Sequence, residues 1–300
     1  MDRNELGKIL MKLSIWGYFC GGIVHLVGLY ILHKVKINLI NQRLLLINVA
    51  VIEMLFGILQ TVLNILQPYL SHSFVFGLID LCCICLLLTM YHLAMLHLTL
   101  DRLFDIYLHI KYPTVFQKEK LVRIIAFLWA ASTTTAMGMV LLALTKRNIS
   151  ITLKYVMLVQ ISMDFIIIIS FIVTYAYLFY KVKTLVQEHA RVPGFNRGIS
   201  KTNVKEKFIV PCVMVLTYIA FMFTSGILAT LSHVKSAKPG VPDILLYSIA
   251  NFLVIFGIIS DAVIYIFLQR DNRDFILSCI NRIKNRNSSE STTSGGSSEV

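Results

Sequence analysis

The chain has 300 residues and a formal net charge of +12, yet only 15% of its residues are charged and 57% are hydrophobic. Soluble domains are nearer half apolar and a quarter charged, so this composition excludes an ordinary soluble domain. The mean hydropathy of +0.74 supports the same exclusion.

The apolar residues are gathered in seven long segments. Each segment has roughly the 20 residues that a helix needs to cross a bilayer core of about 30 Å. We therefore predict an all-α membrane protein, a seven-transmembrane helix bundle over residues 13–268 that follows an extracellular tail of residues 1–12. In chain order the segments span residues 13–33, 44–67, 79–101, 124–145, 155–180, 208–231 and 244–268.

The lysines and arginines predict how the chain crosses the membrane. Most of the 28 lie in segments that are cytoplasmic if the N-terminus is outside. The positive-inside rule then places the C-terminus in the cytoplasm, and we expect a multi-pass protein of the plasma membrane. Asn148 begins an Asn-Ile-Ser glycosylation sequon in what is then an extracellular loop. Topology and anionic lipid thus explain the positive charge, and no nucleic-acid partner is predicted.

The segment after the seventh span has two parts. Residues 269–284 alternate charged and apolar residues at helical spacing, which predicts an amphipathic helix on the membrane surface. Cys279 within it is a candidate for palmitoylation or a bare thiol. Residues 285–300 are rich in Ser, Thr and Gly and are expected to form a disordered cytoplasmic tail.

The third apolar segment ends on charge, because Asp101 and Arg102 follow Leu100 directly. An ion pair at such a rim adds little stability and suits a contact that is closed in one state and open in another. The other interpretation is a pair whose charged ends simply reach water. These two residues alone leave both interpretations open.

Several segments carry short motifs near their ends. Residues 101–112 read DRLFDIYLHIKY, residues 46–55 read LINVAVIEML with Glu53, and the fourth segment contains Trp129. Tyr175 lies in TYAYLFYKVK, and residues 260–271 read SDAVIYIFLQRD with Asp261 and Tyr265. In this order the motifs resemble those of the rhodopsin-like (class A) family of G-protein-coupled receptors over nearly the whole chain.

Some positions depart from the family pattern. Leu103 replaces a tyrosine, Ala262 and Ile167 replace prolines of the seventh and fifth segments, and Gly77 replaces a cysteine. Prolines normally kink such helices, so their loss bears on how the bundle would move. The extracellular loops hold no cysteine, and no structural disulfide is predicted.

The resemblance implies a receptor that passes an extracellular ligand signal to a heterotrimeric G protein through Asp101 and Arg102. On activation Arg102 would leave Asp101 and meet Tyr175 and Tyr265. Ile110 would be the apolar plug that the inner loop offers to the G protein. Kinases and arrestin would act at the tail, and the ligand is unknown.

The resemblance also places His25, Glu53 and Asp261 at family positions that face each other across the first, second and seventh segments. Two carboxyls close together in a low dielectric cannot both stay charged cheaply. They would share a proton, hold a cation such as sodium, or pair with a protonated His25. A static polar contact between helices is the remaining alternative.

Polar side chains in the outer halves of the segments are the candidates for a ligand pocket. Gln160 and Asp164 are four residues apart on one helical face, and so are Tyr247 and Asn251. Ile84 stands where the family's amine receptors carry an aspartate, which argues against ordinary amine recognition.

A proton- or ion-coupled membrane transporter is the alternative function. The odd number of segments and the lack of a visible internal repeat count against it. The histidines are dispersed, and no zinc-protease or nucleophile-elbow motif is present, so we expect no enzymatic activity, no cofactor and no metal site.

Overall fold

The computed structural model describes residues 3–35, 40–70, 73–108, 111–146, 149–190, 201–234 and 243–293. Within these ranges the chain is helical almost throughout and contains no strand. The elements are α1 (Arg3–Lys34), α2 (Ile40–Leu70), α3 (Phe74–Leu108), α4 (Tyr112–Val115), α5 (Lys118–Lys146), α6 (Ile149–Ala190), α7 (Lys201–Tyr218), η2 (Ile219–Phe223), α8 (Thr224–Val234), α9 (Ile244–Val263), η3 (Ile264–Leu268) and α10 (Arg270–Thr293).

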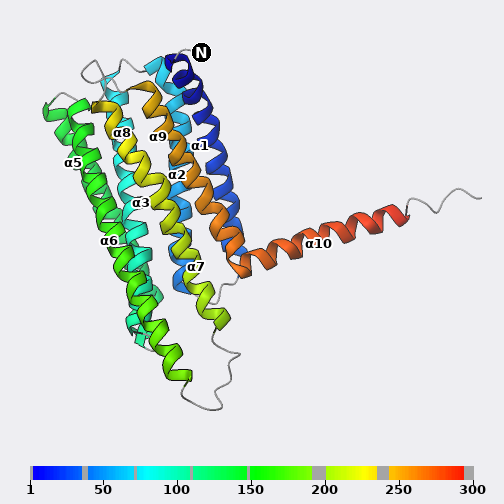
Figure 1. The fold of residues 1–300 in the computed structure, drawn as a ribbon. Coiled ribbons are helices and arrows are strands. Elements are labelled where there is room, and N and C mark those ends of the chain that lie inside the picture. The colour runs from blue at the N-terminus through cyan, green and yellow to red at the C-terminus, as the bar shows by residue number, and fades with distance from the viewer. Residues whose placement is uncertain are drawn as a thin grey trace, which may run out of the picture.

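Seven helical stretches in the described ranges are long and apolar enough to cross a membrane. Figure 1 shows them side by side in one bundle, with α10 leaving at the lower end. The prediction of an all-helical bundle with seven membrane-length helices is confirmed, which indicates a multi-pass membrane protein. The stretches are Glu5–Lys34, Asn41–Leu70, Phe74–Asp105, Lys118–Lys146, Tyr155–Tyr180, Ile209–Ser232 and Ile244–Leu268.

The outward surface of the bundle is strongly apolar. Trp16, Phe127 and Phe179 are 68%, 70% and 75% exposed, and many aliphatic side chains accompany them. Exposed apolar area of this extent marks a surface that meets lipid rather than water. Polar residues such as His25 and Glu53 lie instead in the interior.

Most of the helices run beyond their predicted ends, and α1 and α10 do so in ways that bear on the sites. α1 begins at Arg3, so the described part of the expected N-terminal tail is helical and continuous with the first span. The backbone oxygen of Gly7 accepts a hydrogen bond from the Ser248 hydroxyl at 2.9 Å, which ties this extension to α9. α10 runs to Thr293, nine residues past the predicted end of the surface helix, and lies across the bundle axis (Figure 1).

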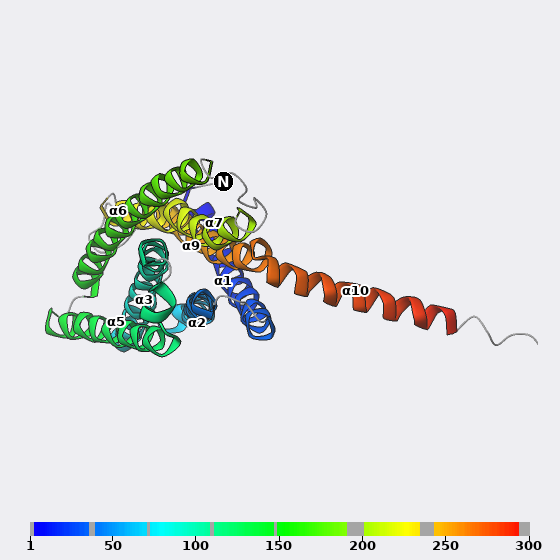
Figure 2. The ribbon, with the colours of Figure 1, turned by 90° about the horizontal axis from the view of Figure 1, so that it is seen from below.

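Helix α3 lies among the other spans and contacts α2, α5, α6 and α7. Figure 2 looks along the bundle and shows α3 enclosed by these neighbours. Trp129 on α5 donates a hydrogen bond from Nε1 to Asn48 Oδ1 on α2 at 3.0 Å, which holds the fourth span beside the second.

Glycines let α1 approach α2 and α9 closely. A Cβ atom at Gly57 would lie 2.7 Å from the Tyr18 backbone oxygen and 2.8 Å from the Gly22 nitrogen. A Cβ atom at Gly28 would collide with the ring of Tyr265. Small residues at such crossings bring helix backbones together inside membranes. The position of α1, and of its His25, is therefore fixed from two sides.

Two π-helical segments interrupt the sixth and seventh spans. η2 joins α7 to α8, and η3 follows α9 and contains Tyr265. π-Segments inside helices often occur at functional sites. Gly257 packs against η2, since a Cβ there would meet the Phe221 Cβ at 3.4 Å. The irregularity that proline gives other helices is thus supplied here by backbone geometry, next to Ala262.

Candidate functional site

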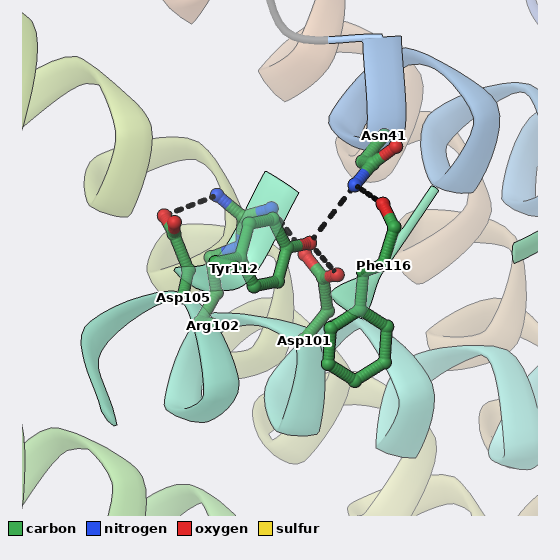
Figure 3. Close-up of polar contacts among 6 residues, drawn as sticks. All are labelled: Asn41, Asp101, Arg102, Asp105, Tyr112 and Phe116. Carbon is green, nitrogen blue, oxygen red and sulfur yellow. Dashed lines mark hydrogen bonds and ion pairs between the residues drawn. The ribbon is translucent and has the colours of Figure 1, made fainter. Parts of the chain in front are cut away.

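The inner end of α3 carries a buried ion pair (Figure 3). Asp101 and Arg102 are 2% and 3% exposed, and an Arg102 guanidinium nitrogen donates to Asp101 Oδ2. Arg102 Nη1 also lies 3.8 Å from Asp105 Oδ2. Asp101 and Arg102 thus form a closed ion pair at this end of α3. Because both side chains are buried, the alternative of charged ends that simply reach water does not hold.

Tyr112 on α4 closes the ion pair from the loop side. Its hydroxyl donates to Asp101 Oδ1 and accepts from Asn41 Nδ2 at 3.4 Å (Figure 3). Burial and the neighbouring Asp101 carboxylate raise the pKa of the Tyr112 hydroxyl, so it remains a donor at neutral pH. Asn41 Nδ2 also donates to the Phe116 backbone oxygen at 2.8 Å, which fixes the loop to α2.

The other predicted switch residues are not bonded to Arg102 in this structure. The Tyr265 hydroxyl lies 3.0 Å from His25 Nδ1 on α1. Tyr175 on α6 is hydrogen-bonded to Cys212 on α7. The structure therefore contains the closed ion pair with both tyrosines held elsewhere. Ile110 lies outside the described residues.

His25, Glu53 and Asp261 meet in the middle of the bundle, as predicted, and we call them the polar core. All three are 1% exposed or less. His25 Nε2 lies 3.2 Å from Glu53 Oε2, and it lies 2.8 Å from the Ile258 backbone oxygen. Glu53 and Asp261 are close enough for a carboxyl–carboxyl hydrogen bond.

Further hydroxyl groups surround Asp261. Tyr91 on α3 donates to Asp261 Oδ2 at 2.6 Å, and Thr217 on α7 donates to Oδ1 at 3.0 Å. Neither Glu53 oxygen accepts a hydrogen bond from the described residues. The two carboxyls therefore differ: Asp261 is satisfied as a carboxylate, whereas Glu53 is suited to carry the proton that joins them.

A cavity of about 210 Å³ opens between the spans toward the end at which α3 begins. All four residues predicted from the sequence as pocket candidates line it: Gln160, Asp164, Tyr247 and Asn251. The Tyr18 hydroxyl on α1 donates to Asn251 Oδ1 at 3.3 Å. Gln160 Nε2 is buried and has no hydrogen-bond partner among the described residues.

Asp164, the intramembrane acid singled out in the sequence, is paired through its Oδ1 oxygen. The Tyr218 hydroxyl donates to its Oδ1, and His92 Nε2 lies 3.1 Å from the same oxygen. The Tyr218 ring lies 5.6 Å from the Tyr91 ring, which in turn bonds Asp261. A polar column (Asp164, Tyr218, Tyr91, Asp261, Glu53 and His25) thus runs from the cavity to the middle of the bundle.

Sequence reasoning missed several residues of these sites. Asp80 lines the cavity, and the rule that singled out Asp164 would have found it, since both are acids within a span. Tyr218, Thr217 and Tyr112 gave no such signal, because their roles depend on which neighbouring helix they face. Within the described ranges, no three His, Cys, Asp or Glu residues are grouped to hold a metal ion.

Two modification sites were predicted from the sequence, at Cys279 and Asn148. Cys279 is a half-buried free thiol on α10. Asn148 lies outside the described residues, and its glycosylation stays a prediction.

Comparison with known proteins adds no assignment. No protein-family model matches the chain, and no curated protein matches its sequence.

Proposed function

We propose that this protein is a G-protein-coupled receptor that resembles the rhodopsin-like family, with its N-terminus outside the plasma membrane. The observation that carries the proposal is the buried Asp101–Arg102 pair at one end of α3, with a cavity at the other end of the same helix. A buried pair that is not needed for stability suits a two-state switch.

The polar column gives the proposal a physical link between the two ends. A ligand in the cavity that displaces Asp164 would disturb Tyr218 and, through the Tyr91 ring, Asp261. Asp261 lies one turn before Tyr265, the residue that would move to meet Arg102. A signal would then pass along the contacts that join α6, α7, α3 and α9.

The test measures nucleotide exchange on G proteins in membranes of cells that express the full chain. Asp101→Asn should raise ligand-free exchange, because it frees Arg102 from a charge-assisted bond. Adding Arg102→Ala to that variant should abolish the rise while surface expression stays the same. Arg270→Ala is the matched control, since Arg270 is an exposed arginine paired only with Asp274 at 3.6 Å. Full exchange in the Arg102→Ala protein would refute the receptor proposal.

One observation favours a second candidate, a proton-coupled transporter. The polar column places titratable groups in sequence through half the bundle, as proton relays in pumps do. Purified protein in liposomes with an imposed voltage separates the two functions. A transporter moves protons, and Glu53→Gln stops the movement; a receptor shows no flux above empty liposomes.

A further inference from the structure

The cavity holds a carboxylate that no protein group neutralises. Asp80 on α3 lines the cavity, and no hydrogen bond or ion pair joins its side chain to any other described residue. Asp164, the other acid of the lining, is occupied by Tyr218 and His92. Asp80 is partly buried, and a carboxylate that is partly withdrawn from water without a partner is available to a cation that comes from outside the chain.

The rest of the lining fits a small organic cation. Among the described residues that line the cavity there is no lysine or arginine, so none of them competes as a permanent cation for Asp80. Tyr18, Phe56 and Tyr247 add aromatic rings, which attract cations through their faces and cover the apolar body of a ligand. The unpartnered Gln160 amide offers a donor to an acceptor group on the same ligand.

Asp80 also changes what Ile84 implies. The two residues are four apart on α3 and share one face, and both line the cavity. Position 84 carries no carboxylate, but Asp80 supplies one a helical turn nearer the cavity mouth. At about 210 Å³ the cavity is below the 300–1,000 Å³ range of drug-sized pockets, so the ligand is small.

We propose that the cavity binds a small organic amine with an apolar or aromatic body, whose ammonium group pairs with Asp80. This inference rests on the proposed receptor function, since it names the ligand class of that receptor's cavity. The ammonium would donate to the Asp80 carboxylate, and the apolar body would lie against Tyr18, Phe56 and Tyr247. No covalent step is involved.

The experiment measures thermal unfolding of the purified full chain in detergent, without a G protein. Three amines serve as probes: 2-phenylethylamine, cyclohexylmethylamine and choline. Their uncharged counterparts of matched shape are 2-phenylethanol, cyclohexylmethanol and 3,3-dimethyl-1-butanol. We expect at least one amine, and none of the alcohols to the same extent, to raise the melting temperature. Asp80→Asn should lower the affinity for that amine at least about tenfold, because a charge-assisted bond is lost.

A second readout needs no ligand. Asp80→Asn should raise the melting temperature of the empty protein, because the unpaired carboxylate opposes folding while the amide does not. Glu119→Gln, which neutralises an exposed acid at the opposite end of the bundle, should change neither readout.

Any of three results would overturn the proposal: no stabilisation by any amine, equal stabilisation by the paired alcohol, or unchanged amine affinity in Asp80→Asn. A lower melting temperature for empty Asp80→Asn would do so too, since it would show that the carboxylate already has a partner. None of these results depends on G-protein coupling, so the receptor proposal stands or fails separately on Arg102.

Discussion

Removing the Tyr112 hydroxyl should increase ligand-free signalling. Tyr112→Phe keeps the aromatic ring, which stacks on Phe116 with centroids 5.2 Å apart. It deletes the hydroxyl that donates to Asp101 and accepts from Asn41 at 3.4 Å. The Asp101–Arg102 pair then loses its support from the loop side. If this contact belongs to the closed state alone, its loss moves the equilibrium toward the open state.

The magnitude follows from the kind of bond that is lost. A hydrogen bond to a charged group is worth about 1.5–3 kcal/mol, which is about a tenfold to hundredfold change in an equilibrium constant. A receptor with about 1% of its molecules open without ligand, within the usual range for a minor state, would rise to between about 10% and about 50% open. The hydroxyl stays protonated, as its raised pKa requires, so this increase should not vary with pH around neutrality.

The assay is ligand-free nucleotide exchange on G protein in membranes with matched surface expression. Tyr107→Phe is the control, because Tyr107 also lies near the inner end of α3 but is 70% exposed. The double variant with Asp101→Asn tests the path of the effect. If the hydroxyl acts through Asp101, the two substitutions together should raise exchange no further than Asp101→Asn alone.

An exchange rate for Tyr112→Phe equal to that of Tyr107→Phe would refute the reasoning, provided the protein is folded. Thermal unfolding shows whether the Tyr112→Phe protein is folded, since a substitution that only destabilises the fold lowers the melting temperature without raising exchange. Fully additive effects of Tyr112→Phe and Asp101→Asn would show that the hydroxyl acts elsewhere.

Three further predictions concern the fold, the polar core and the topology. Gly57→Ala should lower the melting temperature by several degrees, because its methyl group meets backbone atoms of α1, whereas Gly138→Ala should leave it equal or higher, because nothing lies within 4 Å of a Cβ there. Signalling should rise as pH falls from about 8 to 5.5 if the switch takes up a proton, and Asp261→Asn should flatten the profile; a response flat in pH but suppressed by sodium would favour a bound cation. Asn148→Gln should abolish a glycan shift on gels, and a shift lost only with Asn287→Gln would invert the topology.

How much of the fold the sequence predicted depends on the kind of signal. The seven spans follow from long apolar runs, which are local, so their number and order agree with the structure. Their ends do not, because α1 and α10 continue through polar residues such as Lys8 and Ser288 that have no apolar signal. The polar core was predictable because the motifs fix the register of each helix, and register decides which residues face inward.

The contacts that depend on helix rotation and on the loop were not predictable in this way. Tyr112 lies in a short loop helix, and only the fold brings it to Asp101 and Asn41. Tyr218 looks like an ordinary span residue until α7 is seen to face Asp164. Spacing of four residues indicated the polar pairs on α6 and α9 and not Asp80, because the residues four away from Asp80 on α3, Phe76 and Ile84, are apolar.

His25 joins the polar core to the proposed switch. Its Nε2–H is directed at the Ile258 backbone oxygen, so Nδ1 is the bare acceptor that takes the Tyr265 hydroxyl proton. If Tyr265 leaves to meet Arg102, as the proposed activation requires, this buried nitrogen loses its donor at a cost of about 1–3 kcal/mol.

A proton on Nδ1 offsets part of that cost, because the imidazolium is then attracted to Glu53, whose Oε2 lies 3.2 Å from Nε2. That proton comes either from the carboxyl pair or from solvent. If Glu53 gives the proton to His25, the number of protons bound to the polar core does not change, and signalling does not depend on pH. A proton taken from solvent makes activation increase as pH falls. The slope of signalling against pH thus distinguishes a proton transfer within the polar core from proton uptake out of solvent. Glu53→Gln keeps the shape of the side chain but has no acidic proton to give, so in that variant only uptake from solvent should remain.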